Sequence, residues 1–106
     1  MTEASSPWAV DFTGPSKKQK ENLPEDIYSL LLALKTALEW KGPERKEWPH
    51  YGKLAGKGKN QDYRHCHLNN NRPVYVVVWK VVDMAVQVME IRYVGTHENA
   101  DYRRIH

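Results

Sequence analysis

Three of the five histidines stand at the ends of apolar segments, and they are the side chains of this chain best suited to chemistry. His65 and His67 alternate with Cys66 and Leu68, and His97 closes the later segment Tyr-Val-Gly-Thr-His. On a strand, this alternation places His65 and His67 on one face and the cysteine and leucine on the other. Imidazole is the side chain that exchanges protons near neutral pH. Among many lysines and arginines, these histidines indicate acid–base chemistry on a phosphate-bearing partner.

Two other interpretations of the histidines stay open from the residues alone. A His-x-His spacing on a strand can chelate a metal ion, with His97 as a third ligand. However, no Asp, Glu or second Cys stands at ligand spacing nearby, so we predict no metal site. The pair could also be a surface pair without a role. The sequence contains no phosphate-binding glycine fingerprint, no nucleophile elbow and no zinc-finger spacing.

Positive side chains surround the same predicted strand ends. They are Lys53, Lys57, Lys59, Arg64, Arg72, Arg92, Arg103 and Arg104. Each one alone is better explained as a solvated surface residue. Together with Tyr51, Tyr93 and Tyr102, they are typical of a surface that neutralises phosphates and stacks on bases.

The length and composition predict one small domain. The chain has 106 residues, a net charge of +3 and an isoelectric point of about 9.0, so an anionic partner is plausible. We expect a flexible N-terminal arm over residues 1–7 and a single domain over 8–106. Cys66 is the one cysteine, which excludes an intrachain disulfide and fits a reducing cytoplasm. No signal peptide and no apolar stretch long enough to span a membrane is visible.

The first half of the domain predicts one strand and two helices. Residues 8–13 alternate apolar and polar side chains as a strand does. A short polar helix is expected over 16–22, with Ser16 as its N-cap. An amphipathic helix follows over 24–41, with Pro24 at its first position, and Gly-Pro ends it.

The second half predicts a sheet. Residues 44–60 lack periodicity and are expected to form a long basic loop. Three strands over 62–68, 74–82 and 85–94 should follow, joined by turns at 69–73 and 83–84 and ended by a polar tail over 98–106. Strands joined by short turns are antiparallel, and the continuous apolar run 74–82 favours a central strand. The fold class is therefore α+β, with the order β-α-α-β-β-β and a mainly antiparallel four-stranded sheet packed on two helices.

Four short segments together resemble the RelE/ParE superfamily of type II toxin–antitoxin toxins. They are Gly-Lys-Leu at 52–54, Tyr-Arg-His-Cys-His-Leu at 63–68, Trp-Lys-Val-Val-Asp at 79–83 and Tyr-Val-Gly-Thr-His at 93–97. The resemblance covers roughly residues 8–102 and is greatest to the YafQ branch of the RelE-type mRNA interferases. It implies a small RelE-like fold and a metal-independent endoribonuclease that needs no cofactor. Such an enzyme cuts mRNA in the ribosomal A site by attack of the RNA 2′-hydroxyl. The implied partners are a cognate antitoxin, the ribosome and mRNA, with DNA reached only through the antitoxin and no membrane involved.

The resemblance also implies roles for individual residues. His67 stands at the strand histidine of the YafQ branch, and His65 stands where that branch has an aspartate. His97 matches the histidine of the Gly-Thr-His motif, which implies an acid or base next to the scissile phosphate. Tyr93 occupies the position of a phosphate-binding arginine, so it joins His65, His67 and His97 among the candidate catalytic residues. Tyr102 matches a C-terminal aromatic that stacks on an mRNA base.

The tyrosine at position 93 is a departure from the pattern, because the phosphate charge must then be met elsewhere. The candidates for RNA binding are Lys53, Lys57, Lys59, Arg64, Arg92 and Tyr102. His50 resembles a histidine that precedes the second strand, at an offset about two residues longer here. Which histidine is the base and which the acid stays open, because their pKa values depend on burial.

Two other functions remain as alternatives. A ParE-like toxin that inhibits gyrase shares this fold but performs no RNA chemistry, and it has no need of titratable side chains at these positions. A non-catalytic RNA-binding or metal-binding module is the other alternative.

Overall fold

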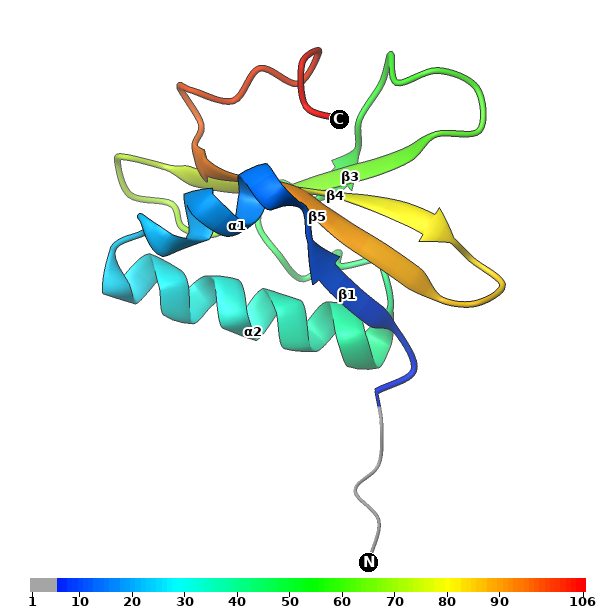
Figure 1. Ribbon diagram of the computed structural model, residues 1–106. Coiled ribbons are helices and arrows are strands. Elements are labelled where there is room, and N and C mark those ends of the chain that lie inside the picture. The colour runs from blue at the N-terminus through cyan, green and yellow to red at the C-terminus, as the bar shows by residue number, and fades with distance from the viewer. Residues whose placement is uncertain (1–5) are drawn as a thin grey trace, which may run out of the picture.

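The computed structural model describes residues 6–106, and five residues of the predicted N-terminal arm lie outside this range. Figure 1 shows a twisted sheet with both helices on one face and the C-terminal segment on the other. The elements in chain order are β1 (Ala9–Phe12), α1 (Gly14–Glu21), α2 (Glu25–Lys41), β2 (Gly52–Lys53), β3 (Asp62–His67), β4 (Tyr75–Asp83) and β5 (Val88–Thr96). None of the helices in this range is long and apolar enough to cross a membrane.

The sheet has five strands in the order β1-β5-β4-β3-β2, with β4 at its centre. Only the β1–β5 pair is parallel, and the other pairs are antiparallel. This confirms the α+β class and the central position of the apolar strand. The extra strand is β2, inside the segment expected to be a loop: Gly52 pairs with His65 and Lys53 with Arg64. Pairing of main-chain groups, not side-chain periodicity, defines such a short strand, so periodicity missed it.

Helix α2 carries the main core. It ends at Lys41 as predicted, whereas Pro24 is its N-cap and not its first helical residue. Its buried face consists of Ile27, Leu31, Leu34 and Leu38. This face packs against Val10, Cys66, Val77, Trp79, Met89 and Ile91 of the sheet. Each fully buried leucine contributes roughly 2 kcal/mol through removal of apolar surface from water.

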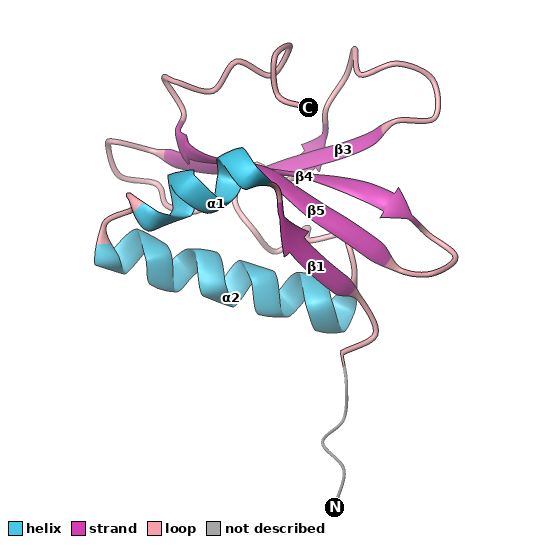
Figure 2. Ribbon diagram, viewed as in Figure 1, coloured by secondary structure: helices cyan, strands magenta, loops and turns pink. Residues whose placement is uncertain are grey.

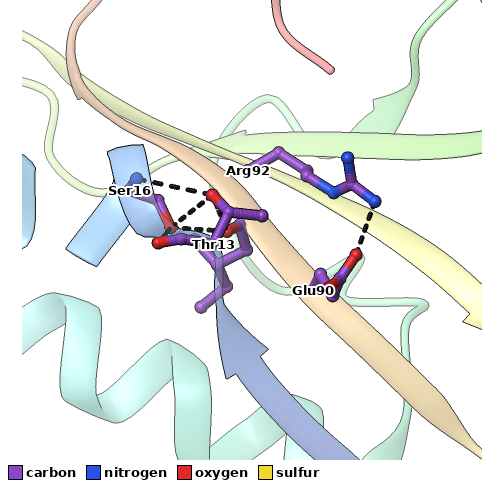
Figure 3. Close-up of polar contacts among 5 residues, drawn as sticks. Thr13, Ser16, Glu90 and Arg92 are labelled. Atoms are coloured by element: carbon purple, nitrogen blue, oxygen red, sulfur yellow. Dashed lines mark hydrogen bonds and ion pairs between the residues drawn. The ribbon is translucent and has the colours of Figure 1, made fainter.

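Helix α1 begins earlier than predicted, and its N-cap is Thr13. The Thr13 hydroxyl accepts a hydrogen bond from the Ser16 N–H, so Ser16 lies inside the first turn. The Ser16 side chain is buried and donates to the Ile91 carbonyl at 2.6 Å (Figure 3). Ser16 is the third residue of a helix that begins at Gly14, so it cannot be the N-cap, and its side chain is used to hold the helix against the sheet.

The β4–β5 hairpin has a longer turn than predicted, and its register is irregular. The turn occupies residues 84–87, and β5 runs from Val88 to Thr96. Val78 pairs with Tyr93 but Trp79 pairs with Ile91, so Arg92 is an extra residue in β5. This bulge reverses the alternation. Ile91 therefore faces the helices, while Tyr93 faces the opposite side.

A second, smaller core lies on the face of the sheet that the helices leave uncovered. It consists of Tyr63, Val76, Val78, Tyr93 and Ile105. Ile105 comes from the C-terminal segment, which folds back over this face as the loops in pink show in Figure 2. Lys57 Nζ donates to the Ile105 carbonyl at 2.6 Å, which ties the loop before β3 to the C-terminal segment. We call this side of the sheet the outer face.

Candidate active site

Four histidines gather at one end of the outer face, with His67 at their centre. The rings of His50 and His67 are stacked with their centroids 4.1 Å apart. The His97 ring meets His67 edge-on, with 5.4 Å between centroids. His65 lies two residues along the same strand and adds its charge to the surroundings of His67. The structure thus brings together the three predicted histidines and adds His50, for which the resemblance offered only an offset match.

Main-chain contacts hold these histidines in place. The His67 N–H donates to the Pro49 carbonyl at 2.8 Å, which fixes the segment before His50 against β3. His50 itself has a φ of 55°, a left-handed conformation that is uncommon for residues other than glycine. The His97 N–H donates to the Val74 carbonyl at 2.7 Å. His65 places its Nδ1 3.0 Å from the Gly52 carbonyl oxygen of β2. The cluster is therefore built by β2, β3, β5 and one strained loop residue.

The surroundings of His67 favour its neutral form. Burial lowers the pKa of His67 below 6.5, and the positive charges of His50, His97 and His65 lower it further. A neutral imidazole has a free nitrogen lone pair and can accept a proton. At pH 7 His67 is therefore suited to act as a base.

His67 and His97 line a pocket of about 270 Å³ between the start of β4 and the end of β5. Arg72 and Glu98 contribute one positive and one negative side chain to its wall, and Thr96 contributes a hydroxyl. Two imidazoles and a guanidinium around one opening can hold a phosphate and transfer protons at it.

Tyr93 supports this end of β5 and does not present its hydroxyl to the pocket. The side chain is buried, and its hydroxyl donates to the Thr96 carbonyl at 2.9 Å. Burial raises the pKa of Tyr93, with a smaller contribution from Tyr102. A Cβ at Gly95 would lie 2.7 Å from the Tyr93 hydroxyl oxygen. A side chain at position 95 would therefore collide with the Tyr93 ring, which explains why a glycine stands there within the strand.

Arg64 is not brought together with the histidines. It alternates with His65 on β3, and its side chain is 8% exposed. Its guanidinium forms an ion pair with Asp62 at 2.9 Å and donates to the Tyr51 hydroxyl. The hydrogen bond to Asp62 raises the pKa of Arg64 and lowers that of Asp62. The charge of Arg64 is therefore neutralised on the side of the sheet away from His65 and His67.

The other predicted RNA-binding residues differ in whether their positive charge is already paired or packed against the protein. Arg92 forms an ion pair with Glu90 along β5 (Figure 3). Lys57 lies 4.9 Å from the Tyr63 ring centroid, and burial lowers its pKa. Lys53 and Lys59 are exposed and form no ion pair with any residue in the range 6–106.

Tyr102 is the predicted RNA-binding residue whose side chain contacts a histidine of the cluster. Its ring meets His65 edge-on, with 5.6 Å between centroids. Burial raises the pKa of Tyr102, and its ring is only partly covered. It can therefore offer one aromatic surface beside the histidines.

Among residues 6–106, no group of three or more His, Cys, Asp or Glu side chains is arranged to hold a metal ion. The stacked rings of His50 and His67 explain this in part. Stacked rings lie face to face, whereas ligand nitrogens must converge on one point.

Comparison with known proteins links this geometry to one fold. No protein-family model and no curated protein sequence matches the chain. The structure is similar to archaeal RelE in the RelE–RelB complex from Pyrococcus horikoshii OT3, with a TM-score of 0.70 and 21% identity over 89% of this chain and 99% of that one. It is also similar to a double arginine-to-alanine variant of E. coli RelE in the free state, with a TM-score of 0.62 and 18% identity over 87% and 85% of the two chains. The structure is also similar to the isolated E. coli RelE toxin, with a TM-score of 0.59 and 22% identity over 89% of this chain and 88% of that one. The chain therefore adopts the RelE fold.

Proposed function

We propose that this protein is the toxin of a type II toxin–antitoxin system and cleaves mRNA on the ribosome. The observation that carries the proposal is the cluster of His50, His65, His67 and His97 beside an open pocket on a RelE fold. A protein that only binds gyrase has no need of four titratable rings at one end of its sheet. The solved structures with this fold are described as toxins, which supports the same reading.

The geometry suggests how the cleavage proceeds. The RNA 2′-oxygen attacks the adjacent phosphorus, the bond from phosphorus to the 5′-oxygen breaks, and a 2′,3′-cyclic phosphate remains. His67, held neutral, takes the proton of the 2′-hydroxyl, and His97 gives a proton to the leaving 5′-oxygen. Arg72, in the wall of the same pocket, offsets the negative charge that builds on the phosphate.

The proposed partners follow from the same assignment. One of the similar structures is a complex of RelE with RelB, and by analogy a cognate antitoxin would cover this protein. The net charge of +3 and the exposed lysines Lys53 and Lys59 favour contact with the phosphates of ribosome-bound mRNA. We place the protein in the cytoplasm, where translation occurs, and expect it to reach DNA only through the antitoxin.

Primer extension on a reporter mRNA in a purified translation system tests the proposal. The wild-type protein should cut at in-frame positions only when ribosomes are present. His67→Ala and His97→Ala should each lower the cleavage rate about 10²-fold or more, as expected for loss of a general acid or base. His106→Ala removes an exposed histidine outside the cluster and serves as the matched control.

Three outcomes would contradict the proposal in different ways. Cuts on naked mRNA would show a ribonuclease that does not need the ribosome. Intact mRNA together with DNA damage on expression would favour a gyrase inhibitor. Full cleavage by the double His67→Ala, His97→Ala variant would show that these side chains do not carry the chemistry.

A further inference from the structure

The turn between β3 and β4 forms one wall of the pocket that His67 and His97 line, here called the histidine pocket. Three residues of the turn contribute to this wall: Arg72, Pro73 and Val74. Within the described part of the chain, residues 6–106, no main-chain group of residues 69–73 bonds to another main-chain group. The Arg72 guanidinium forms no ion pair with any residue in that range. The order of this wall must therefore come from side-chain contacts.

The side chain of Asn69 supplies the hydrogen bonds that the main chain of the turn lacks. Its Nδ2 donates to the Asn71 carbonyl at 2.8 Å and to the Pro73 carbonyl at 3.1 Å. These two carbonyls belong to the residues on either side of Arg72. Its Oδ1 accepts from the Tyr75 N–H at 2.8 Å. A carboxamide provides two donor hydrogens and an acceptor in one small planar group, whereas a carboxylate provides acceptors alone.

One peptide group connects Asn69 with His97. The Val74 carbonyl and the Tyr75 N–H belong to the same planar peptide unit, so the position of one fixes the position of the other. The N–H of this unit donates to Asn69, and its carbonyl accepts from the His97 N–H at 2.7 Å. Asn69 and His97 are therefore bonded to a single rigid group.

We propose that Asn69 is a positioning residue of the active site, which holds Arg72 and the main chain of His97 where the cleavage reaction needs them. This inference rests on the proposed function. Asn69 is not among the residues that line the histidine pocket, so it acts on the phosphate only through these two residues. A misplaced group lowers the rate of the chemical step even where the substrate still binds.

Cleavage kinetics on ribosome-bound reporter mRNA give the first test. Asn69→Ala should lower the cleavage rate at saturating protein about tenfold or more, as expected for a displaced reacting group. The protein concentration that gives half of the maximal rate should change less than about twofold, because the exposed lysines still meet the RNA phosphates. Asn70→Ala is the matched control: it removes an exposed amide that forms no side-chain hydrogen bond within residues 6–106. Equal rates for the two variants would overturn the proposal.

A double-variant comparison separates positioning from general support of the fold. In a protein that already carries Arg72→Ala, one of the two groups that Asn69 positions is gone. Asn69→Ala should then lower the cleavage rate by no more than about threefold, because coupled residues do not act additively. The same tenfold loss with and without Arg72 would overturn the coupling.

NMR on the isolated protein tests the two contacts of the carboxamide one by one. Asn69→Asp keeps an acceptor for the Tyr75 N–H but loses both donors. It should lower the heteronuclear NOE of the Arg72 amide and leave hydrogen exchange of the His97 amide as in the wild type. Asn69→Ala should lower the Arg72 NOE and also speed exchange of the His97 amide. Asn69→Asp keeps the measurement informative if Asn69→Ala unfolds.

The two kinds of measurement distinguish failure of this inference from failure of the proposed function. If the wild type cuts and Asn69→Ala cuts equally well, Asn69 does not position the site, although the proposed function stands. If the wild type never cuts, the proposed function fails, and NMR decides what Asn69 does to the turn. Unchanged Arg72 and His97 signals in both Asn69 variants would then overturn the inference as well.

Discussion

His67 is the histidine whose protonation should affect both the activity and the stability of the protein. Its pKa is lowered in the folded state by burial and by neighbouring imidazoles, while its ordinary value is 6.5. The stability linked to neutral His67 is therefore complete above pH 6.5 and is lost as the pH falls through the lower, folded pKa. Urea unfolding of the wild type should show a lower free energy of unfolding at about pH 5.5 than at about pH 7.5.

His67→Gln should flatten this pH dependence, because the amide does not titrate. His106→Gln changes an exposed histidine outside the cluster and should leave it as in the wild type. An equally steep pH dependence in His67→Gln would place the proton uptake elsewhere. Cleavage by the wild type should fall over the same acidic range, because a protonated His67 cannot accept the 2′-hydroxyl proton.

Gly95 gives a second prediction at the residue scale. A Cβ there would lie 2.7 Å from the hydroxyl oxygen and 3.0 Å from Cζ of the buried Tyr93 ring. Gly95→Ala should therefore displace the ring, break its hydrogen bond to Thr96 and destabilise the protein by about 1–3 kcal/mol. Gly14→Ala is the control, because nothing lies within 4 Å of a Cβ at that position. Urea denaturation that shows equal stability for the two variants would contradict the proposed contact.

At the scale of elements, two side chains of α1 bond to the main chain of β5: Gln19 accepts from the Val94 N–H, and Ser16 makes the shorter contact. Thr13 caps the helix, and the Ser16 hydroxyl donates to the Ile91 carbonyl of β5 (Figure 3). That carbonyl also accepts from the Thr13 N–H, so it stays bonded when Ser16 is replaced. Ser16→Ala should cost about 1 kcal/mol, the usual net value of one hydrogen bond. Ser29→Ala, in an exposed part of α2, should cost clearly less in the same chemical denaturation assay, and equal losses would contradict the role of Ser16.

The elements also differ in how far the sequence predicts them. The apolar period of α2 and the continuous apolar run of β4 determine where they pack, so both were predicted within a residue or two. β2 has no side-chain signal, since it exists through main-chain pairing with β3. The bulge at Arg92 reverses the faces of β5, which alternation cannot show. Arg64 is a different case. It was counted among the RNA-binding residues for its charge alone, although its alternation with His65 on the strand already indicated that it points away from the histidines.

In the candidate site, too, side-chain alternation predicts part of the arrangement, and irregular backbone geometry decides the rest. His65 and His67 share a face because they alternate on a strand, and this was readable from the sequence. His97 approaches them because β3 and β5 both pair with β4, which the predicted order of the strands made reasonable. The stack of His50 on His67 depends on a left-handed residue in an irregular loop, for which the sequence has no periodic signal.

At the scale of the whole molecule, the two faces of the sheet are closed by different means. Two helices cover one face, whereas the outer face depends on residues from the loop before β3 and from the C-terminal segment. Ile105 is the buried side chain of that segment and packs with Tyr63, Val76 and Val78. The Ile105 carbonyl accepts from Lys57, so the same residue also holds the loop. The C-terminal segment is therefore part of the fold and positions Tyr102 beside His65.

Ile105→Ala should consequently lower the free energy of unfolding by about 2 kcal/mol, the lower end for loss of a buried isoleucine side chain. Arg103→Ala, an exposed change two residues away, should be within about 0.5 kcal/mol of the wild type. Hydrogen exchange should separate the two contacts of Ile105. Lys57→Met keeps the apolar stem over Tyr63 and removes the donor, so it should speed amide exchange over residues 54–61 with a smaller loss of global stability. If Ile105→Ala and Arg103→Ala unfold at the same urea concentration, the segment does not close the outer face, and Tyr102 has no fixed place beside the histidines.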